Sequence, residues 1–162
     1  METVSERPDP RIRSAGPGDA EEIARLLHDF NTEYEEPTPG PKFIAERVAE
    51  LLGGGETKVL LAGDPPAGLA VLRFRRSLWS PGLECYLAEL YVAPDRRGQG
   101  LGRALMDAVI DLARAEGADY IDLNTAVEDR AARSLYESLG FDNRGGHPDD
   151  PGAANLYYEL EL

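Results

Sequence analysis

The sequence has little sulfur and little histidine, and this shortage excludes several kinds of site. Its 162 residues include one cysteine, Cys85, and two histidines. A single cysteine cannot form an internal disulfide, and no cluster of histidine, cysteine and acidic residues has the spacing of a zinc site. We therefore predict that the protein binds no metal and that Cys85 is a small residue of a buried strand.

Long apolar runs and basic residues are also scarce. No run approaches the roughly 20 apolar residues that cross a bilayer, and residues 1–13 lack the apolar centre of a secretory signal. We therefore expect a cytoplasmic protein with no membrane partner. Acidic residues number 30 against 17 Lys and Arg, and the net charge of −13 would repel nucleic acid. The acidity is compatible with a cationic substrate, and equally with solubility alone.

The length and the apolar pattern predict one domain. Residues 1–10 are charged and contain proline, which predicts a disordered leader, and residues 11–162 form the domain. Hairpins are expected to join the strands before residue 92, and helical crossovers those after it, in a mixed α/β sheet with helices on both sides. The expected strands are residues 11–14, 57–62, 67–74, 83–92, 120–124 and 155–162, with a polar loop at 142–154.

A basic, glycine-rich turn lies between the strand at residues 83–92 and an amphipathic helix. Backbone N–H groups at the entry to a helix bind anions, and the helix dipole adds to the attraction. The spacing does not fit a dinucleotide-binding loop, which would need a glycine in place of Arg103, nor a P-loop. The turn therefore predicts a different phosphate-bearing ligand. It reads Arg96-Arg97-Gly98-Gln99-Gly100-Leu101-Gly102.

Two segments carry a resemblance to a known family. The pattern Arg-x-x-Gly-x-Gly, from Arg97 to Gly102, resembles the acyl-CoA pyrophosphate loop of the GNAT superfamily of N-acetyltransferases. Residues 129–141 are similar to the family pattern Asn-x-x-Ala-x-x-Leu-Tyr-x-x-x-Gly-Phe, with Asp129 where the family often has asparagine. With the element order, the resemblance covers about residues 11–162. It implies a GNAT-like, mixed and mostly antiparallel central sheet flanked by helices, in which a splayed strand pair holds the acyl-CoA.

The resemblance implies an enzyme that moves an acetyl group from acetyl-CoA to a primary amine by direct attack in a ternary complex. Asp129 can still cap its helix, but it cannot donate the hydrogen bond of an asparagine amide, which leaves its contact with the co-substrate open. The residues implied in binding acetyl-CoA are Leu90, Tyr91, Val92, Arg96, Arg97, Gly98, Gln99, Gly100, Leu101, Gly102, Asn124, Asp129 and Tyr136.

The chemistry requires a base and an acid. An alkylammonium with a pKa of about 10.4 must lose a proton before it attacks, and a carboxylate, or a water that it holds, can assist. Glu89 is the first candidate base and Glu84, on the same strand, is the second; an ion-paired strand residue is an equal interpretation of Glu89. The departing thiolate needs a proton, and Tyr136 matches the family's general acid, with a packing tyrosine as the alternative.

The acceptor is expected to contact three variable segments, residues 33–41, 75–82 and 142–154. Trp79, in the second of them, is expected to pack over its hairpin. Acetylation of a protein lysine or N-terminus, and a non-catalytic acyl-CoA-binding or sensing module, stay open as alternatives, and so does a homodimer. A small cationic acceptor is favoured by the acidic residues Glu33, Glu35, Glu36, Asp149 and Asp150.

Overall fold

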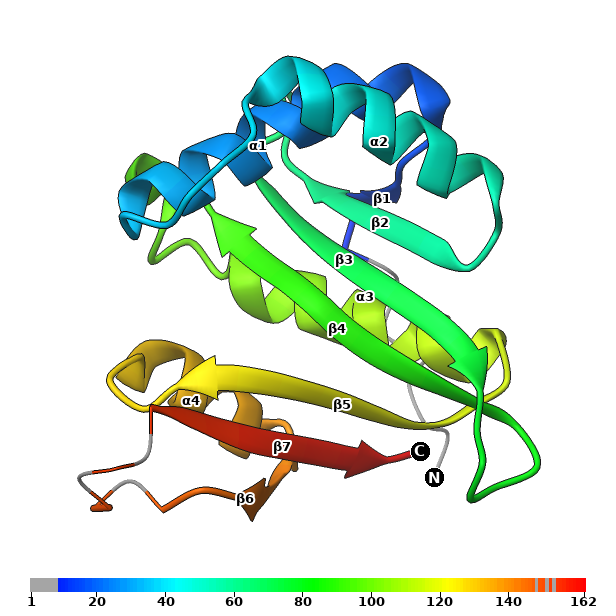
Figure 1. Ribbon diagram of the computed structural model, residues 1–162, viewed down its shortest axis with the longest axis vertical. Helices are drawn as coiled ribbons and strands as arrows, with labels where there is room; N and C mark the ends of the chain where they lie inside the picture. Colours follow the sequence, from blue (N-terminus) through cyan, green and yellow to red (C-terminus); the bar gives the residue numbers. More distant parts are fainter. Residues whose placement is uncertain (1–8, 148, 151, 153) are drawn as a thin grey trace. The chain divides into compact units, whose positions relative to one another are not determined.

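The computed structural model describes residues 9–147, 149, 150, 152 and 154–162, so most of the predicted leader lies outside the described residues. The strands form a seven-stranded, mostly antiparallel sheet in the order β1-β2-β3-β4-β5-β7-β6 (Figure 1). The mixed α/β fold with flanking helices is therefore confirmed. The strands are β1 (Ile12–Ser14), β2 (Thr57–Ala62), β3 (Gly68–Arg76), β4 (Leu83–Val92), β5 (Ala118–Ala126), β6 (Asp142–Gly145) and β7 (Asn155–Glu161).

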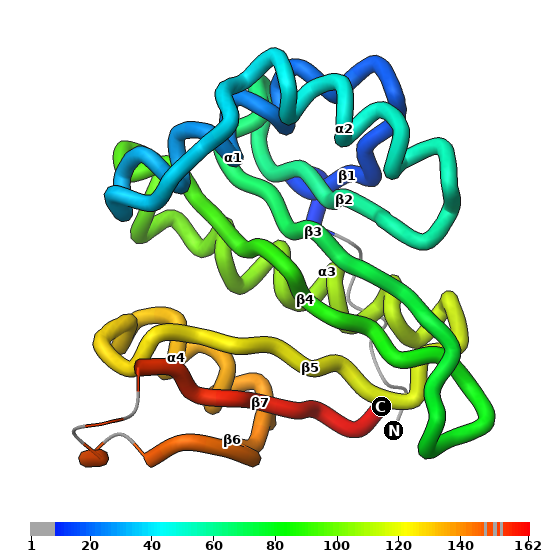
Figure 2. The backbone as a smooth tube through the Cα atoms, in the orientation of Figure 1, coloured from blue at the N-terminus to red at the C-terminus, as the bar shows by residue number. Residues whose placement is uncertain are grey.

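The amphipathic helix predicted after the glycine-rich turn is α3. Pro41 begins α2, where its missing N–H costs no helical hydrogen bond, and Gly40 before it has a φ of +96°. Figure 2 traces the backbone from α1 through residues 34–40 into α2. The α-helices in the described part of the chain are α1 (Ala20–Glu33), α2 (Pro41–Gly53), α3 (Leu101–Ala115) and α4 (Arg130–Ser138), and two short 3-10 turns are η1 (Pro17–Asp19) and η2 (Pro94–Arg96).

Contacts within the chain define two compact units. The first contains residues up to Val71 together with Glu89–Val109. In it, α1 and α2 lie side by side, and β1 pairs antiparallel with β2 (Figure 1). The apolar stripes of the two helices supply one side of the core and alternate residues of the strands supply the other. The buried cluster comprises Ala20, Ile23, Leu26, Val48, Val59, Leu61, Leu69 and Tyr91.

The second unit contains Leu72–Ala88 and Ile110–Leu162. In it, β4 and β5 pair in parallel, with Cys85 opposite Ile121, which confirms the predicted strand–helix–strand crossover. β5 then pairs antiparallel with the whole of β7, from Tyr120 opposite Glu161 to Ala126 opposite Asn155. The predicted second crossover is therefore wrong, because α4 leads into an antiparallel hairpin.

Two local predictions are corrected. The predicted polar loop at residues 142–154 begins with a strand, β6, which pairs antiparallel with β7. β6 is polar and mostly exposed, so its sequence lacks the apolar alternation of a half-buried strand. Trp79 does not pack over its hairpin: its side chain is 88% exposed, beside Leu78 at 89%.

The buried position of Leu61 gives a stability prediction with a matched control. Leu61 is fully buried in β2, whereas Leu78 is almost fully exposed. We expect Leu61→Ala to lower the free energy of unfolding by about 2–5 kcal/mol, because the truncation leaves a cavity. Leu78→Ala, the same chemical change, should stay within about 0.5 kcal/mol of the unmodified protein. Urea unfolding measures both, and equal losses would contradict the core assignment.

Candidate functional site

The glycine-rich turn joins β4 to α3 in the first unit. Gly98 and Gly100 have φ angles of +76° and +79°, a region that residues with a side chain rarely adopt. A Cβ built on Gly98 would meet no atom within 4 Å, so glycine is required there by the backbone conformation and not by crowding. The two glycines let the chain turn sharply out of the short helix η2 and enter α3 at Leu101.

The start of α3 presents backbone N–H groups that the helix does not use. The N–H of Ala104 donates to the carbonyl of Gly100 at 3.0 Å, which is the first hydrogen bond of the helix. The amides of Leu101 and Gly102 precede this bond and have no acceptor within the helix. Together with the helix dipole, they make the N-terminus of α3 suited to an anion.

Two arginines hold Gln99, in the middle of the turn. Arg96 donates from Nε to the side-chain Oε1 of Gln99 at 3.1 Å, and Arg11 donates from Nη1 to its carbonyl at 2.9 Å. Arg11 is itself paired with Asp9, and this pairing lowers the pKa of Asp9 to about 2. Sequence reasoning missed Arg11, because 88 residues separate it from Gln99 and no local pattern connects them.

Arg97, the first residue of the loop pattern, contacts α1 and the end of β4. Its Nη2 donates to both carboxylate oxygens of Glu33, at 2.9 and 2.7 Å, and its Nε donates to the carbonyl of Val92 at 2.9 Å. The side chain is 43% exposed. Arg97 therefore already has an anionic partner from the segment where acceptor contacts were expected.

The end of β4 carries the other predicted residues of this unit. Tyr91 is buried, whereas Leu90 and Val92 are half-buried. β4 lies close to Gly68 of β3, where a Cβ would come within 3.0 Å of the carbonyl oxygen of Tyr91. Glu89 is half-buried, and burial raises the pKa of its carboxyl group. A raised pKa favours a role in proton transfer near neutral pH.

The second candidate base, Glu84, lies in the second unit and has two partners. Arg75 donates from Nε to its Oε1, and the hydroxyl of Tyr120 donates to its Oε2. The side chain is 14% exposed. Both carboxylate oxygens of Glu84 are thus engaged, whereas Glu89 has no such ion pair among the described residues.

Tyr136 is a buried residue of α4 and is 5% exposed. Its ring lies 5.8 Å from that of Phe141 and 6.2 Å from that of Tyr158, measured between centroids. Burial, and then the negative charge of Asp129, raise the pKa of the Tyr136 phenol. The hydroxyl therefore keeps its proton at neutral pH, as a proton donor must.

Asp129 caps α4, as its sequence position predicts. Its Oδ1 accepts the N–H of Ala132 at 3.1 Å. Asn124, on β5, donates from its amide to the hydroxyl of Tyr86 at 3.2 Å. The structure thus gives both residues a local partner within the second unit.

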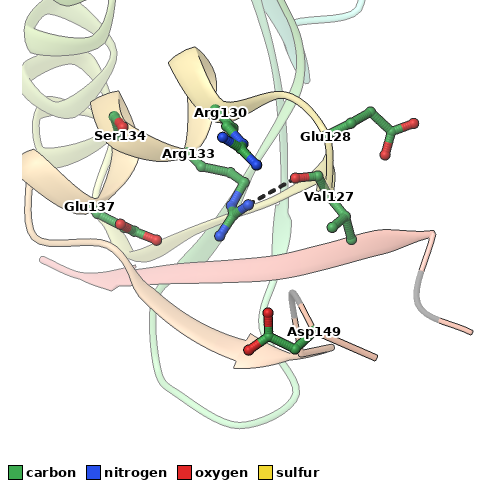
Figure 3. Close-up of a pocket in the computed structure, with 7 residues that line it drawn as sticks. All are labelled: Val127, Glu128, Arg130, Arg133, Ser134, Glu137 and Asp149. Carbon is green, nitrogen blue, oxygen red and sulfur yellow. Dashed lines mark hydrogen bonds between the residues drawn. The ribbon is translucent and has the colours of Figure 1, made fainter. Parts of the chain in front are cut away.

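A pocket of about 590 Å³ lies beside α4 in the second unit (Figure 3). Arg133 reaches into it and donates from Nη1 to the carbonyl of Val127 at 2.8 Å, while its Nε is buried without a hydrogen-bond partner among the described residues. Glu137 accepts the hydroxyl of Tyr158 at 2.7 Å. Asp149, from the predicted acceptor loop, also lines this mixed-charge pocket, with Glu128, Arg130 and Ser134.

Cys85 is fully buried, as predicted, and burial followed by the negative charge of Asp122 raises the pKa of its thiol to about 12. A thiol with that pKa is protonated and unreactive near neutral pH. Within the described ranges, no three His, Cys, Asp or Glu residues form a group that could hold a metal ion. None of the helices described is long and apolar enough to cross a membrane.

The fold and the loop together define a class, an α/β protein with a glycine-rich turn between β4 and α3 that suits an anion. Comparison with known proteins gives the family: the chain belongs to the acetyltransferase (GNAT) family, whose model matches residues 21–141. Two sequence relatives, both named as acetyltransferases, agree with this assignment. The protein is therefore an acyltransferase enzyme.

Three relatives show how far the similarity extends. Thialysine N-epsilon-acetyltransferase from Bos taurus is 32% identical over 142 residues, covering 80% of this chain and 82% of its own length. Mycothiol acetyltransferase from Beutenbergia cavernae is 34% identical over 140 residues, covering 81% of this chain but only 44% of its own length. A crystal structure of a candidate acetyltransferase from Arthrobacter sp. FB24 is 44% identical, covers both chains fully and has a TM-score of 0.79.

The cap at Asp129 gives a prediction about the departure from the family pattern. We expect Asp129→Ala to lower the free energy of unfolding by about 1 kcal/mol, because it removes the acceptor of the Ala132 N–H. Asp129→Asn restores the family's usual residue and should keep most of that stability, since asparagine is an equally good cap. Thermal unfolding of the two variants measures the difference, and a stable alanine variant would show that the cap is unimportant.

Proposed function

We propose that this protein transfers the acetyl group of acetyl-CoA to the primary amine of a small, cationic acceptor by direct attack in a ternary complex. The observation that carries the proposal is the glycine turn, with positive φ at Gly98 and Gly100 and the amides of Leu101 and Gly102 ahead of the Ala104–Gly100 hydrogen bond. Amides and guanidinium groups both donate to phosphate oxygens, so the turn fits a diphosphate. We further infer that residues 11–162 are one catalytic domain, because the family model spans both units.

Acetyl-CoA supplies the acetyl group as a thioester. We assign its diphosphate to the turn, with positive charge added by Arg96 and Arg97. The backbone of Leu90 and Val92, at the half-buried end of β4, takes the pantetheine arm, where we propose that the strands splay. Asn124 and Asp129 are assigned to the same co-substrate, with the Asp129 carboxylate already engaged in its cap. The binding amides are those of Gly98, Gln99, Gly100, Leu101 and Gly102.

Two side chains are assigned to proton transfer. Glu89 accepts the proton that leaves the acceptor's ammonium group, directly or through a water, and the pKa of its half-buried carboxyl is raised by burial. Glu84 is the weaker candidate, because Arg75 and Tyr120 hold both of its oxygens. As the nitrogen–carbon bond forms and the carbon–sulfur bond breaks, Tyr136 donates its phenol proton to the departing sulfur. The nitrogen then releases its second proton to solvent, from which the phenol is reprotonated. The raised pKa of Tyr136 keeps that proton in place beforehand.

The nature of the acceptor is supported by charge and by the relatives. Glu33 ends α1, and Glu35 and Glu36 follow it in the segment between α1 and α2. Carboxylates attract a cation. By their names, two of the relatives are a thialysine N-epsilon-acetyltransferase and a mycothiol acetyltransferase, and both names refer to small molecules. A cytoplasmic location and a homodimer stay predictions.

The proposal is tested by a screen of amines with acetyl-CoA, in which thiol release is the readout. The panel should hold chemically distinct acceptors, such as thialysine, a polyamine, an aminoglycoside and a lysine peptide. We expect release with at least one small cationic amine. Tight binding of acetyl-CoA with no release from any amine would instead identify a non-catalytic acyl-CoA-binding module.

The role of Tyr136 has a matched control in Tyr158, whose ring lies in the same aromatic cluster. We expect Tyr136→Phe to lower kcat by about 100-fold or more, because the variant cannot protonate the sulfur. Its affinity for acetyl-CoA, measured by calorimetry, should hardly change. Tyr158→Phe removes the same atom elsewhere and should retain kcat within about threefold, since the hydroxyl of Tyr158 donates to Glu137 and is assigned no proton transfer. Unchanged turnover in Tyr136→Phe would remove the residue from this role.

Glu89 gives a prediction about pH. A base must be ionised, so activity is lost as the pH falls through the pKa of Glu89. Because burial raises that pKa, the acidic limb of kcat/KM should lie above the range of an ordinary glutamate, about 4.3. Glu89→Gln should lower kcat/KM by about 100-fold and abolish the limb. If Glu84→Gln abolishes the limb and Glu89→Gln does not, the role passes to Glu84.

A further inference from the structure

The guanidinium group of Arg97 lies at a site in the first unit that suits cations in general. Both oxygens of Glu33 accept from its Nη2, and its Cζ lies 5.8 Å from the centroid of the Tyr91 ring. A cation over an aromatic face is attracted by the negative charge of that face. Arg97 thus has an anion on one side and a ring face on another.

The walls of this site are fixed by packing that does not involve Arg97. The Tyr91 ring stacks on Phe30 with 4.8 Å between centroids and an angle of 11° between planes. The Tyr91 hydroxyl donates to Oε1 of Glu33 at 3.4 Å. Asp29 lies one helical turn before Glu33 and is paired with Arg25 at 3.6 Å. Burial and the charge of Glu33 raise the pKa of the Tyr91 phenol, the charge of Arg97 opposes them, and the charge of Asp29 adds to the rise. The site therefore has negative character whether or not Arg97 fills it.

Arg97 also belongs to the turn to which the diphosphate is assigned. A diphosphate carries more negative charge than one carboxylate and offers oxygens that match the fork of a guanidinium group. The pair with Glu33 is partly exposed, at 27% for Glu33 and 43% for Arg97, so separating the two is cheap. The arrival of a diphosphate would therefore draw Arg97 toward the turn and leave Glu33 and Tyr91 without their cation.

We propose that Glu33 and the face of Tyr91 bind a second cationic group of the acceptor, and that Arg97 occupies this site until the acyl donor binds. The proposal rests on the proposed function and adds to it the residue that selects the acceptor. It makes Glu33 a specificity-determining residue and Arg97 the link between donor and acceptor binding.

The position of the candidate base sets the length of the acceptor. Glu89 and Tyr91 are two residues apart on β4, so their side chains lie on the same face of the strand. At the rise of a β-strand, they are about 7 Å apart along it. An acceptor whose two amines are separated by about 7 Å, as in an extended pentane-1,5-diamine, can therefore reach both residues. The amine near Glu89 is acetylated and the other stays charged at Glu33.

The kinetic test compares pentane-1,5-diamine with pentylamine, which has the same chain and one charge fewer. With saturating acetyl-CoA, we expect kcat/KM of the unmodified protein to favour the diamine by about tenfold, as a charge-assisted contact implies. Glu33→Gln should reduce this ratio to near one by raising KM for the diamine alone. Glu46→Gln, which removes the same charge from α2, should leave the ratio within about twofold, since exposed charges are screened. Arg97→Lys, which loosens the pair but keeps Glu33, should preserve the preference.

A second measurement does not need turnover. Isothermal titration calorimetry with acetyl-CoA should show about threefold tighter binding to Glu33→Gln than to the unmodified protein, because Arg97 no longer leaves a partner. Acetyl-pantetheine, which has no diphosphate, should bind both proteins equally. Glu46→Gln again supplies the control for charge.

The outcomes separate this proposal from the proposed function. If no amine leads to thiol release, the transferase proposal fails. Calorimetry still tests whether binding of acetyl-CoA separates Arg97 from Glu33. If the protein acetylates amines but Glu33→Gln slows the diamine and pentylamine alike, Glu33 is structural and the proposal is overturned. Equal affinity of acetyl-CoA for the unmodified protein and Glu33→Gln also overturns it, because the handover of Arg97 is then absent. Loss of the diamine preference with tighter donor binding supports it.

Discussion

The start of α3 is the constraint on which the candidate site depends. After β4 ends, the chain must turn within a few residues so that the first amides of α3 point in one direction. Gly98 and Gly100 adopt the positive φ angles of this turn without the steric strain that a side chain would cause. The other groups of the turn are arranged around it: Arg11 and Arg96 fix Gln99, and Arg97 reaches back to Glu33. A residue with a Cβ at either glycine would strain the backbone at the point where the amides converge.

The elements that were predicted well from the sequence are those whose signals lie in neighbouring residues. The strand at residues 83–92 has the predicted bounds, and the buried positions of α3 follow helical spacing, because periodicity and glycine punctuation are properties of neighbouring residues. β6 escaped prediction because its polar, exposed residues pair through backbone groups with β7. Backbone hydrogen bonds to β7 therefore stabilise β6 as a strand, although its side chains do not show a strand pattern.

The candidate site was predictable in its residue types but not in its partners. The sequence placed Arg97 in a turn predicted to bind an anion, but its contact with Glu33 joins residues 64 positions apart and depends on how α1 packs. The same holds for Glu84, whose two donors come from neighbouring strands, and for Arg11. Motifs identify which side chains carry the chemistry, whereas tertiary packing decides which of them are already engaged.

The single tryptophan and the single cysteine lie at opposite extremes of exposure. Trp79 is 88% exposed on its hairpin, so its fluorescence in the native protein already resembles that of an indole in water. Unfolding the core would change that signal little, and a fluorescence melt would underestimate the loss of structure. Cys85, fully buried with a thiol pKa of about 12, becomes reactive only when its strand opens. Thiol labelling is therefore a suitable reporter of core unfolding in this protein. Because Cys85 is buried in the native enzyme, it also adds no background signal to an assay that measures free thiol.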